Sequence, residues 1–165
     1  MAEPPRRRAR GLNPDSPTFD HEASRSIIYQ AAGPMLQPAP GAAPAKPAPA
    51  GGGAQSYAMV VLVNPTPAEE GSPDLSYDAI HMQEVLGGAG MTSARLYSLY
   101  RPLTKGYAAP TFLAVWWFQG GDLDATPADL AARRGDGRIK AVKRWSPDHV
   151  QVYYCKQLSV RANKA

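Results

Sequence analysis

One short segment of the chain holds most of the side chains that could carry acid–base chemistry. It contains a tyrosine, two carboxylates and a histidine at close spacing: Tyr77, Asp78, His81 and Glu84. A histidine beside a carboxylate can titrate near neutral pH, which is what a general acid or base requires. The sequence therefore predicts that His81 is the proton-transfer residue. Glu84 or Asp78 would set the pKa of His81, and Tyr77 would hydrogen-bond a substrate.

Helical spacing decides which of these side chains meet. We predict a helix over Asp74–Leu86, with Asp74 as its N-cap and Gly87-Gly88 as its stop. Residues three and four apart lie side by side on a helix, so one flank carries Tyr77, Ile80, His81 and Glu84. An adjacent apolar stripe that should pack on a sheet is formed by Leu75, Ala79, Met82 and Leu86. The alternative is a surface helix whose polar residues only pair with one another.

The composition divides the chain into a tail and a domain. Residues 1–55 contain ten of the 17 prolines, and Pro38–Ala54 consists almost entirely of proline, alanine and glycine. Such a segment buries too little apolar surface to offset its ordering entropy, so we expect residues 1–55 to be flexible. An apolar island at 24–37 (SRSIIYQAAGPMLQ) could dock on a sheet edge or recruit a protein partner, or it could have arisen by chance. Residues 56–165 suffice for one compact domain.

Within residues 56–165, apolar runs and turn residues predict four strands and two helices. The strands are Tyr57–Asn64, Met91–Arg101, Thr111–Phe118 and His149–Leu158, and the helices are Asp74–Leu86 and Asp124–Arg134. The order β-α-β-β-α-β is that of a ferredoxin-like plait, so we predict an α+β fold with two helices on one face of a sheet.

The strand over Thr111–Phe118 predicts a homodimer. Its sequence, TFLAVWWF, is apolar at every position from Phe112 onward, so both of its faces must be covered. The two helices can cover only one face. A second copy of the same sheet is the most economical cover for the other, which gives a homodimer through sheet-to-sheet packing.

Three segments of this domain carry a family resemblance. They are Val63-Asn64-Pro65, Ser76–Gly90 (SYDAIHMQEVLGGAG) and Thr111–Trp116 (TFLAVW). They resemble the asparagine-proline turn, the helix sequence WYDEVHLPEVLAVPG and the YLALYE strand of EthD-like small proteins, which belong to the dimeric α/β-barrel superfamily. The matching helix positions are Tyr77, Asp78, His81, Glu84, Val85, Leu86 and Gly90. Ser76 and Gln83 stand where the family has a tryptophan and a proline.

The resemblance implies a dimeric α/β barrel with a site in the apolar cleft between helices and sheet. It also implies a cofactor-independent enzyme, of lyase, cyclase, isomerase or monooxygenase type, that acts on a small aromatic or carbonyl-containing metabolite. Its catalytic residues would be His81, Glu84, Tyr77 and Asp78, and its ligand contacts would be Ile80, Trp116 and Tyr97. The alternative is a non-catalytic small-molecule-binding or assembly protein that recruits a partner through its tail.

Several classes of site and partner are not indicated. The three histidines, His21, His81 and His149, are scattered and no second cysteine is present, so we predict no metal; no glycine-rich loop predicts a nucleotide cofactor. The net charge of +4 is spread over both parts of the chain, which argues against nucleic acid as the main partner. No apolar stretch reaches membrane-spanning length, and the single cysteine, Cys155, fits a reducing cytoplasm.

Basic side chains gather at and after the end of the second predicted helix: Arg133, Arg134, Arg138, Lys140, Lys143 and Arg144. They form either a solvated loop or a rim that attracts an anionic substrate or partner. The sequence leaves both interpretations open.

Overall fold

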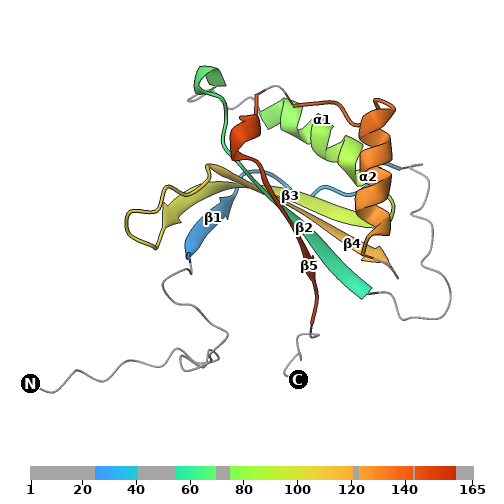
Figure 1. Ribbon diagram of the computed structural model, residues 1–165, viewed down its shortest axis with the longest axis horizontal. Coiled ribbons are helices and arrows are strands. Elements are labelled where there is room, and N and C mark those ends of the chain that lie inside the picture. The colour runs from blue at the N-terminus through green and yellow to red at the C-terminus, as the bar shows by residue number, and fades with distance from the viewer. Residues whose placement is uncertain (1–24, 41–54, 70–74, 121–122, 143, 159–165) are drawn as a thin grey trace, which may run out of the picture.

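The described part of the chain forms one antiparallel sheet with two α-helices on one of its faces (Figure 1). A computed structural model describes residues 25–40, 55–69, 75–120, 123–142 and 144–158. The strands are β1 (Ile27–Ala31), β2 (Gln55–Val63), β3 (Met91–Pro102), β4 (Phe112–Gly120) and β5 (Gln151–Lys156). The α-helices are α1 (Leu75–Leu86) and α2 (Ala125–Gly135), and short 3-10 helices cover Pro67–Glu69 (η1) and Pro147–His149 (η2).

The strands lie in the order β1-β3-β4-β2-β5, and every neighbouring pair is antiparallel. The order β3-β4-β2-β5, connected through α1 and α2, is consistent with a ferredoxin-like plait. The predicted α+β class is therefore confirmed. Most predicted elements form within two residues of their expected limits, and the main difference is the last strand. It begins at Gln151 rather than at His149, because Pro147 occupies the first turn of η2.

The apolar island of the tail forms the edge strand β1. Ile27–Ala31 pairs with the end of β3, with Ile28 opposite Arg101. The chain then continues along the same edge, where Leu36 forms a bridge with Ala94. The island thus docks on the sheet of its own chain. Residues 1–24 and 41–54 of the predicted tail lie outside the described residues.

The core fills the helix-facing side of the sheet. Residues directly opposite one another on paired strands share a face, and the buried ones on this face are Tyr57, Met59, Val63, Met91, Ala94, Leu96, Phe112, Ala114, Trp116 and Phe118. Phe118 is 1% exposed, and its ring stacks on that of Tyr57 with centroids 5.3 Å apart.

Helix α1 contributes to this core through its C-terminal half. Met82 and Leu86 are buried as predicted, but Ala79 is exposed and Val85 is buried instead. The predicted stripe is therefore wrong at Ala79, because the described buried residues of α1, which packs against β3, all lie in the C-terminal half of the helix. The side chain of Leu75 lies outside the described part of the chain.

The turn after α1, Gly87–Gly90, touches both β4 and α2. Gly90 has a φ of +78°, and a Cβ at this position would collide with the carbonyl oxygen of Gln119 in β4. The Ala89 N–H donates to the Oδ2 atom of Asp129 in α2 at 2.8 Å. The predicted helix stop therefore also fixes α2 against the end of α1.

Replacing Gly90 with alanine should destabilise the fold by more than about 2 kcal/mol, since a positive φ alone costs an L-residue about 1–2 kcal/mol. The collision adds to this cost, because the obstructing atom belongs to the backbone of β4. Urea unfolding measures the loss. The matched control is Gly106→Ala, where φ is +75° but no atom lies within 4 Å of the added Cβ. Equal losses in the two variants would contradict the role assigned to the contact with β4.

Candidate functional site

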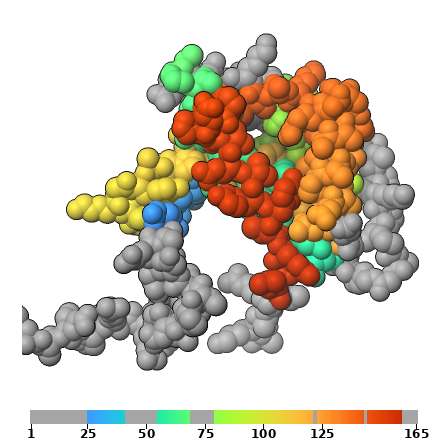
Figure 2. Space-filling model, viewed as in Figure 1, coloured from blue at the N-terminus to red at the C-terminus, as the bar shows by residue number. Residues whose placement is uncertain are grey.

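A cavity of ≈ 670 Å³ lies between the two α-helices and the sheet. Its sheet wall is mostly apolar and consists of Met59, Val61 and Val63 of β2, Leu96 of β3, Ala114 and Trp116 of β4, and Val152 and Tyr154 of β5. Figure 2 shows the surface hollowed between α2, in orange, and the segment from η2 into β5, in red. A space between helices and sheet is therefore open to a small molecule.

The cavity exists because α2 packs against its neighbours through few side chains. Thr126 and Leu130 are its buried residues within the described structure, and the Thr126 hydroxyl donates to the Ala89 carbonyl at 3.1 Å. Four residues of α2 line the cavity: Pro127, Leu130, Ala131 and Arg134. Because alanine carries only a methyl group, space remains between this part of α2 and β5.

His81 lies on α1 and lines this cavity beside a carboxylate. Its side chain is 21% exposed, and its Nδ1 atom lies 3.8 Å from the Oε2 atom of Glu84. The same Oε2 atom accepts a hydrogen bond from the Lys140 N–H at 2.9 Å. The His81 Nδ1 atom is buried and has no hydrogen-bond partner among the described residues. Glu84 therefore holds the segment after α2 in place while its charge acts on His81.

The pKa of His81 lies below its ordinary value of 6.5. Burial is the largest cause, because a buried imidazole loses the water that stabilises its charged form. Three smaller effects follow. The negative charge of Glu84 raises the pKa, the positive charge of Arg134 lowers it, and a backbone hydrogen bond with Lys140 raises it. The imidazole is therefore neutral at neutral pH and able to accept a proton.

Arg134 connects two walls of the cavity electrostatically. Its charge lowers the pKa of His81 on α1. The pKa of Tyr154 on β5 lies above its usual value because of burial, and the charge of Arg134 offsets part of this rise. All three residues line the cavity. An imidazole, a guanidinium and a phenol from three different elements thus come together around one space.

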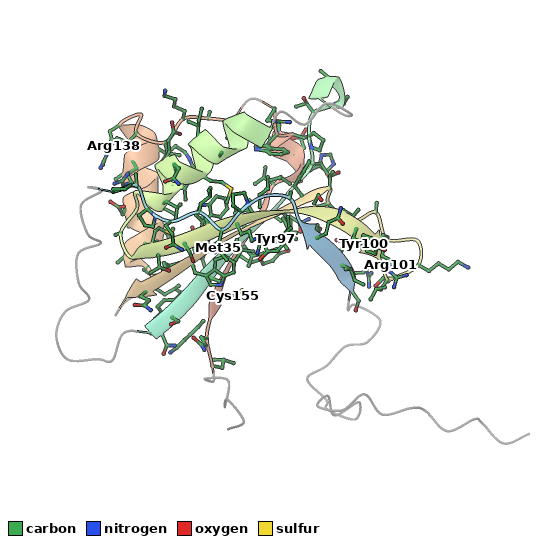
Figure 3. The ribbon with its side chains drawn as sticks, turned by 180° about the vertical axis from the view of Figure 1, so that it is seen from behind. Met35, Tyr97, Tyr100, Arg101, Arg138 and Cys155 are labelled. Atoms are coloured by element: carbon green, nitrogen blue, oxygen red, sulfur yellow. The ribbon has the colours of Figure 1, made fainter. Side chains whose placement is uncertain are left out.

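Of the three predicted ligand contacts, only Trp116 lines the cavity. It is 4% exposed and its Nε1 atom donates to the Met82 carbonyl at 3.5 Å, so it belongs to the core as well as to the cavity wall. Tyr97 follows the cavity-lining Leu96 in β3, so it lies on the opposite face of the sheet (Figure 3). Ile80 is 58% exposed and lies outside the cavity lining.

The other predicted catalytic residues divide into two groups. Glu84 lies beside His81, as helical spacing predicted. Tyr77 and Asp78 lie in α1, but their side chains are outside the described part of the structure. Sequence reasoning did not identify Ala131 or Val142 as cavity residues, because neither has a side chain that signals chemistry.

No group of three or more His, Cys, Asp or Glu side chains that could hold a metal ion occurs within the described ranges. His149 lies apart from the cavity, with its Nδ1 atom 3.0 Å from the Ser146 Oγ atom, and His21 is outside the described residues. Cys155 is exposed on the sheet face opposite the helices (Figure 3). None of the helices in the described ranges is both long and apolar enough to cross a membrane.

Comparison with known proteins gives no match: no family model, no curated protein and no solved structure is similar to this chain.

The titration midpoint of His81, followed by NMR in the full-length chain, should lie below 6.5. Arg134→Gln should raise the midpoint, because it removes a positive charge that opposes protonation. Glu84→Gln should lower it, while the new amide oxygen can still accept the Lys140 N–H. Arg138→Gln, in which an exposed arginine paired with Asp136 loses the same charge, should leave it unchanged. Equal shifts in the two arginine variants would contradict a local effect of Arg134.

This lowered pKa also makes stability depend on pH. The unfolded chain binds a proton at His81 more readily than the folded chain does, so stability should fall as the pH drops from 6.5 towards the folded-state pKa. Urea unfolding at about pH 7.5 and about pH 5.5 should show a larger loss for the wild type than for His81→Gln. The same loss in both proteins would assign the pH dependence to other groups.

Proposed function

We propose that the protein is a cofactor-independent, EthD-like enzyme of lyase, cyclase, isomerase or monooxygenase type. It acts on a small aromatic or carbonyl-containing metabolite in the cavity beside α1, and His81 moves the proton. The observation that carries the proposal is a neutral imidazole at the wall of an apolar cavity, whose buried Nδ1 atom has no hydrogen-bond partner among the described residues.

The size and lining of the cavity support a small-molecule ligand. Its volume of ≈ 670 Å³ falls within the range of about 300–1,000 Å³ that is typical of ligand pockets. Its walls are mostly apolar, with a few polar groups at defined positions. Trp116 offers an aromatic surface inside the cavity, on which the body of an aromatic metabolite can pack.

In the proposed reaction, His81 takes a proton from a carbon next to a substrate carbonyl. The imidazolium that forms is stabilised by the carboxylate of Glu84, whose Oε2 atom lies 3.8 Å from Nδ1. The apolar walls exclude water and strengthen this charge interaction. From the family resemblance, Tyr77 would hydrogen-bond the developing oxyanion and Asp78 would help to set the pKa of His81.

The proposal includes a homodimer that buries the sheet face opposite the helices. Register places Val60, Leu62, Leu113, Val115 and Trp117 together on this face. It is apolar over two central strands, and no helix of the described structure covers it (Figure 1). A second copy of the same face would bury this surface and form the dimeric barrel.

The proposal also places the protein in the cytoplasm, since Cys155 is the only cysteine and no disulfide can form within the chain. A protein partner for residues 24–37 would have to bind the outer edge of β1, because the inner edge pairs with β3. Non-catalytic ligand binding is the alternative to the proposed enzyme, and the next experiment separates the two.

A panel of aromatic ketones and β-keto acids incubated with the full-length protein in D₂O should reveal a compound whose α-proton exchanges faster than without protein. His81→Gln should reduce this exchange by about 10²–10⁴-fold, which is the usual contribution of a positioned acid–base group. His149→Gln is the control and should leave the rate unchanged. A compound that binds in the cavity without accelerated exchange would instead favour the non-catalytic alternative.

Sedimentation of the full-length chain at micromolar concentration should show a dimer. Leu113→Lys places a charge on the apolar face of a central strand and should shift the protein to monomer, because the charge would be buried in the interface. Ala128→Lys adds the same charge on the exposed side of α2 and should leave the dimer intact. A monomeric wild type would overturn the proposed assembly.

A further inference from the structure

We infer that the cavity takes an amphipathic monoanion, whose apolar body lies against the sheet and whose carboxylate or similar acidic group binds Arg134. This inference rests on the proposed use of the cavity as a ligand site, and it adds the chemical class of the ligand. The evidence for this ligand class is the sign and the position of the charged side chains that line the cavity.

The permanent charges around the cavity are of one sign. Two side chains with fixed charge line it, Arg134 from α2 and Lys140 from the segment after α2, and both are positive. No aspartate or glutamate lines it within the described residues. Glu84 is outside the lining, with its Oε2 atom 3.8 Å from the His81 Nδ1 atom, and it accepts the Lys140 N–H. An anion is therefore favoured over a neutral or cationic ligand.

Arg134 differs from Arg133 and Arg138 in having no carboxylate partner among the described residues. Arg133 binds Asp129 at 3.1 Å, and Arg138 binds Asp136 at 2.6 Å. Figure 3 shows Arg138 at the outer side of the molecule, away from the sheet. Of these three arginines, Arg134 is thus the one that lines the cavity and remains available to a ligand carboxylate. Lys140 also lines the cavity and adds to its positive charge, but a guanidinium can bind a carboxylate through two parallel hydrogen bonds, which an ammonium group cannot.

The position of Arg134 defines where the acidic group would sit. Its charge acts on His81 on one side and on Tyr154 on the other. Arg134 is exposed although it lines the cavity, so a ligand can reach it from solvent, whereas Trp116 and Ala114 are buried and form the floor. A ligand that binds the guanidinium can extend its apolar part to the floor and pass the imidazole of His81.

The apolar walls limit the ligand to one charged group. A second charge would lie against Met59, Val61 or Leu96, which cannot replace its hydration. The cavity therefore selects against dicarboxylates and highly charged phosphates. It suits an aromatic or aliphatic acid with a single ionised group.

The test uses 2-naphthoate and its uncharged counterpart 2-naphthalenemethanol, titrated into the full-length protein by calorimetry near neutral pH. Naphthoate should bind at least about tenfold more tightly, as expected for one charge-assisted hydrogen bond in a partly dry site. Arg134→Gln should remove this preference, and Arg138→Gln should keep it. Bound naphthoate should also raise the His81 titration midpoint, whereas the alcohol should not.

A second pair of variants locates the binding site. Ala131→Phe places a large side chain in the cavity lining and should abolish binding of both compounds, whereas Ala132→Phe, at an exposed position of the same helix outside the lining, should not. Equal binding of acid and alcohol, with Ala131→Phe still blocking both, would overturn the anion inference and leave the proposed function standing. Binding of neither compound, or binding unaffected by Ala131→Phe, would overturn both.

Discussion

The close approach of the turn after α1 to β4 and α2 is the constraint on which the rest of the structure depends. A side chain at Gly90 would collide with the backbone of Gln119, and a Cβ at Gly88 would lie 2.8 Å from the Cδ2 atom of Leu130. Because both positions are glycine, the turn after α1 can approach the first half of α2 and the end of β4 closely. The Asp129 and Thr126 hydrogen bonds to Ala89 then fix α2 against this turn.

The far end of α2 is also connected to α1 rather than to the sheet. Ile139, just beyond α2, is 2% exposed, and the Lys140 N–H donates to Glu84. The two helices therefore form a connected unit that meets the sheet near β3 and stands away from it near β5. The cavity follows from this arrangement, and so does the position of His81 between a carboxylate that stabilises its charge and a guanidinium that opposes it.

Sequence patterns predicted the sheet well because its signals are local. Apolar runs and turn residues located β2 to β5 and both helices, and helical spacing placed His81 beside Glu84. Residue spacing could not predict which side of a strand or helix faces the cavity. Tyr97 and Ile80 were predicted to contact a ligand, but both lie outside the cavity lining. The role of Arg134 was equally hidden, because it depends on which residues of α2 line the cavity and on carboxylates that pair with Arg133 and Arg138. The pairing of β1 with β3 required contact between segments far apart in the chain, for which the sequence offered only an apolar island.

That distance has a consequence for how the protein is made. Ile28 pairs with Arg101, a separation of 73 residues (101 − 28), so β1 leaves the ribosome long before its partner strand exists. At a synthesis rate of about 5–20 residues per second, β1 waits for roughly 4–15 seconds with its backbone groups unpaired. During this interval both edges of β1 are open, and another nascent chain can pair with it before β3 does.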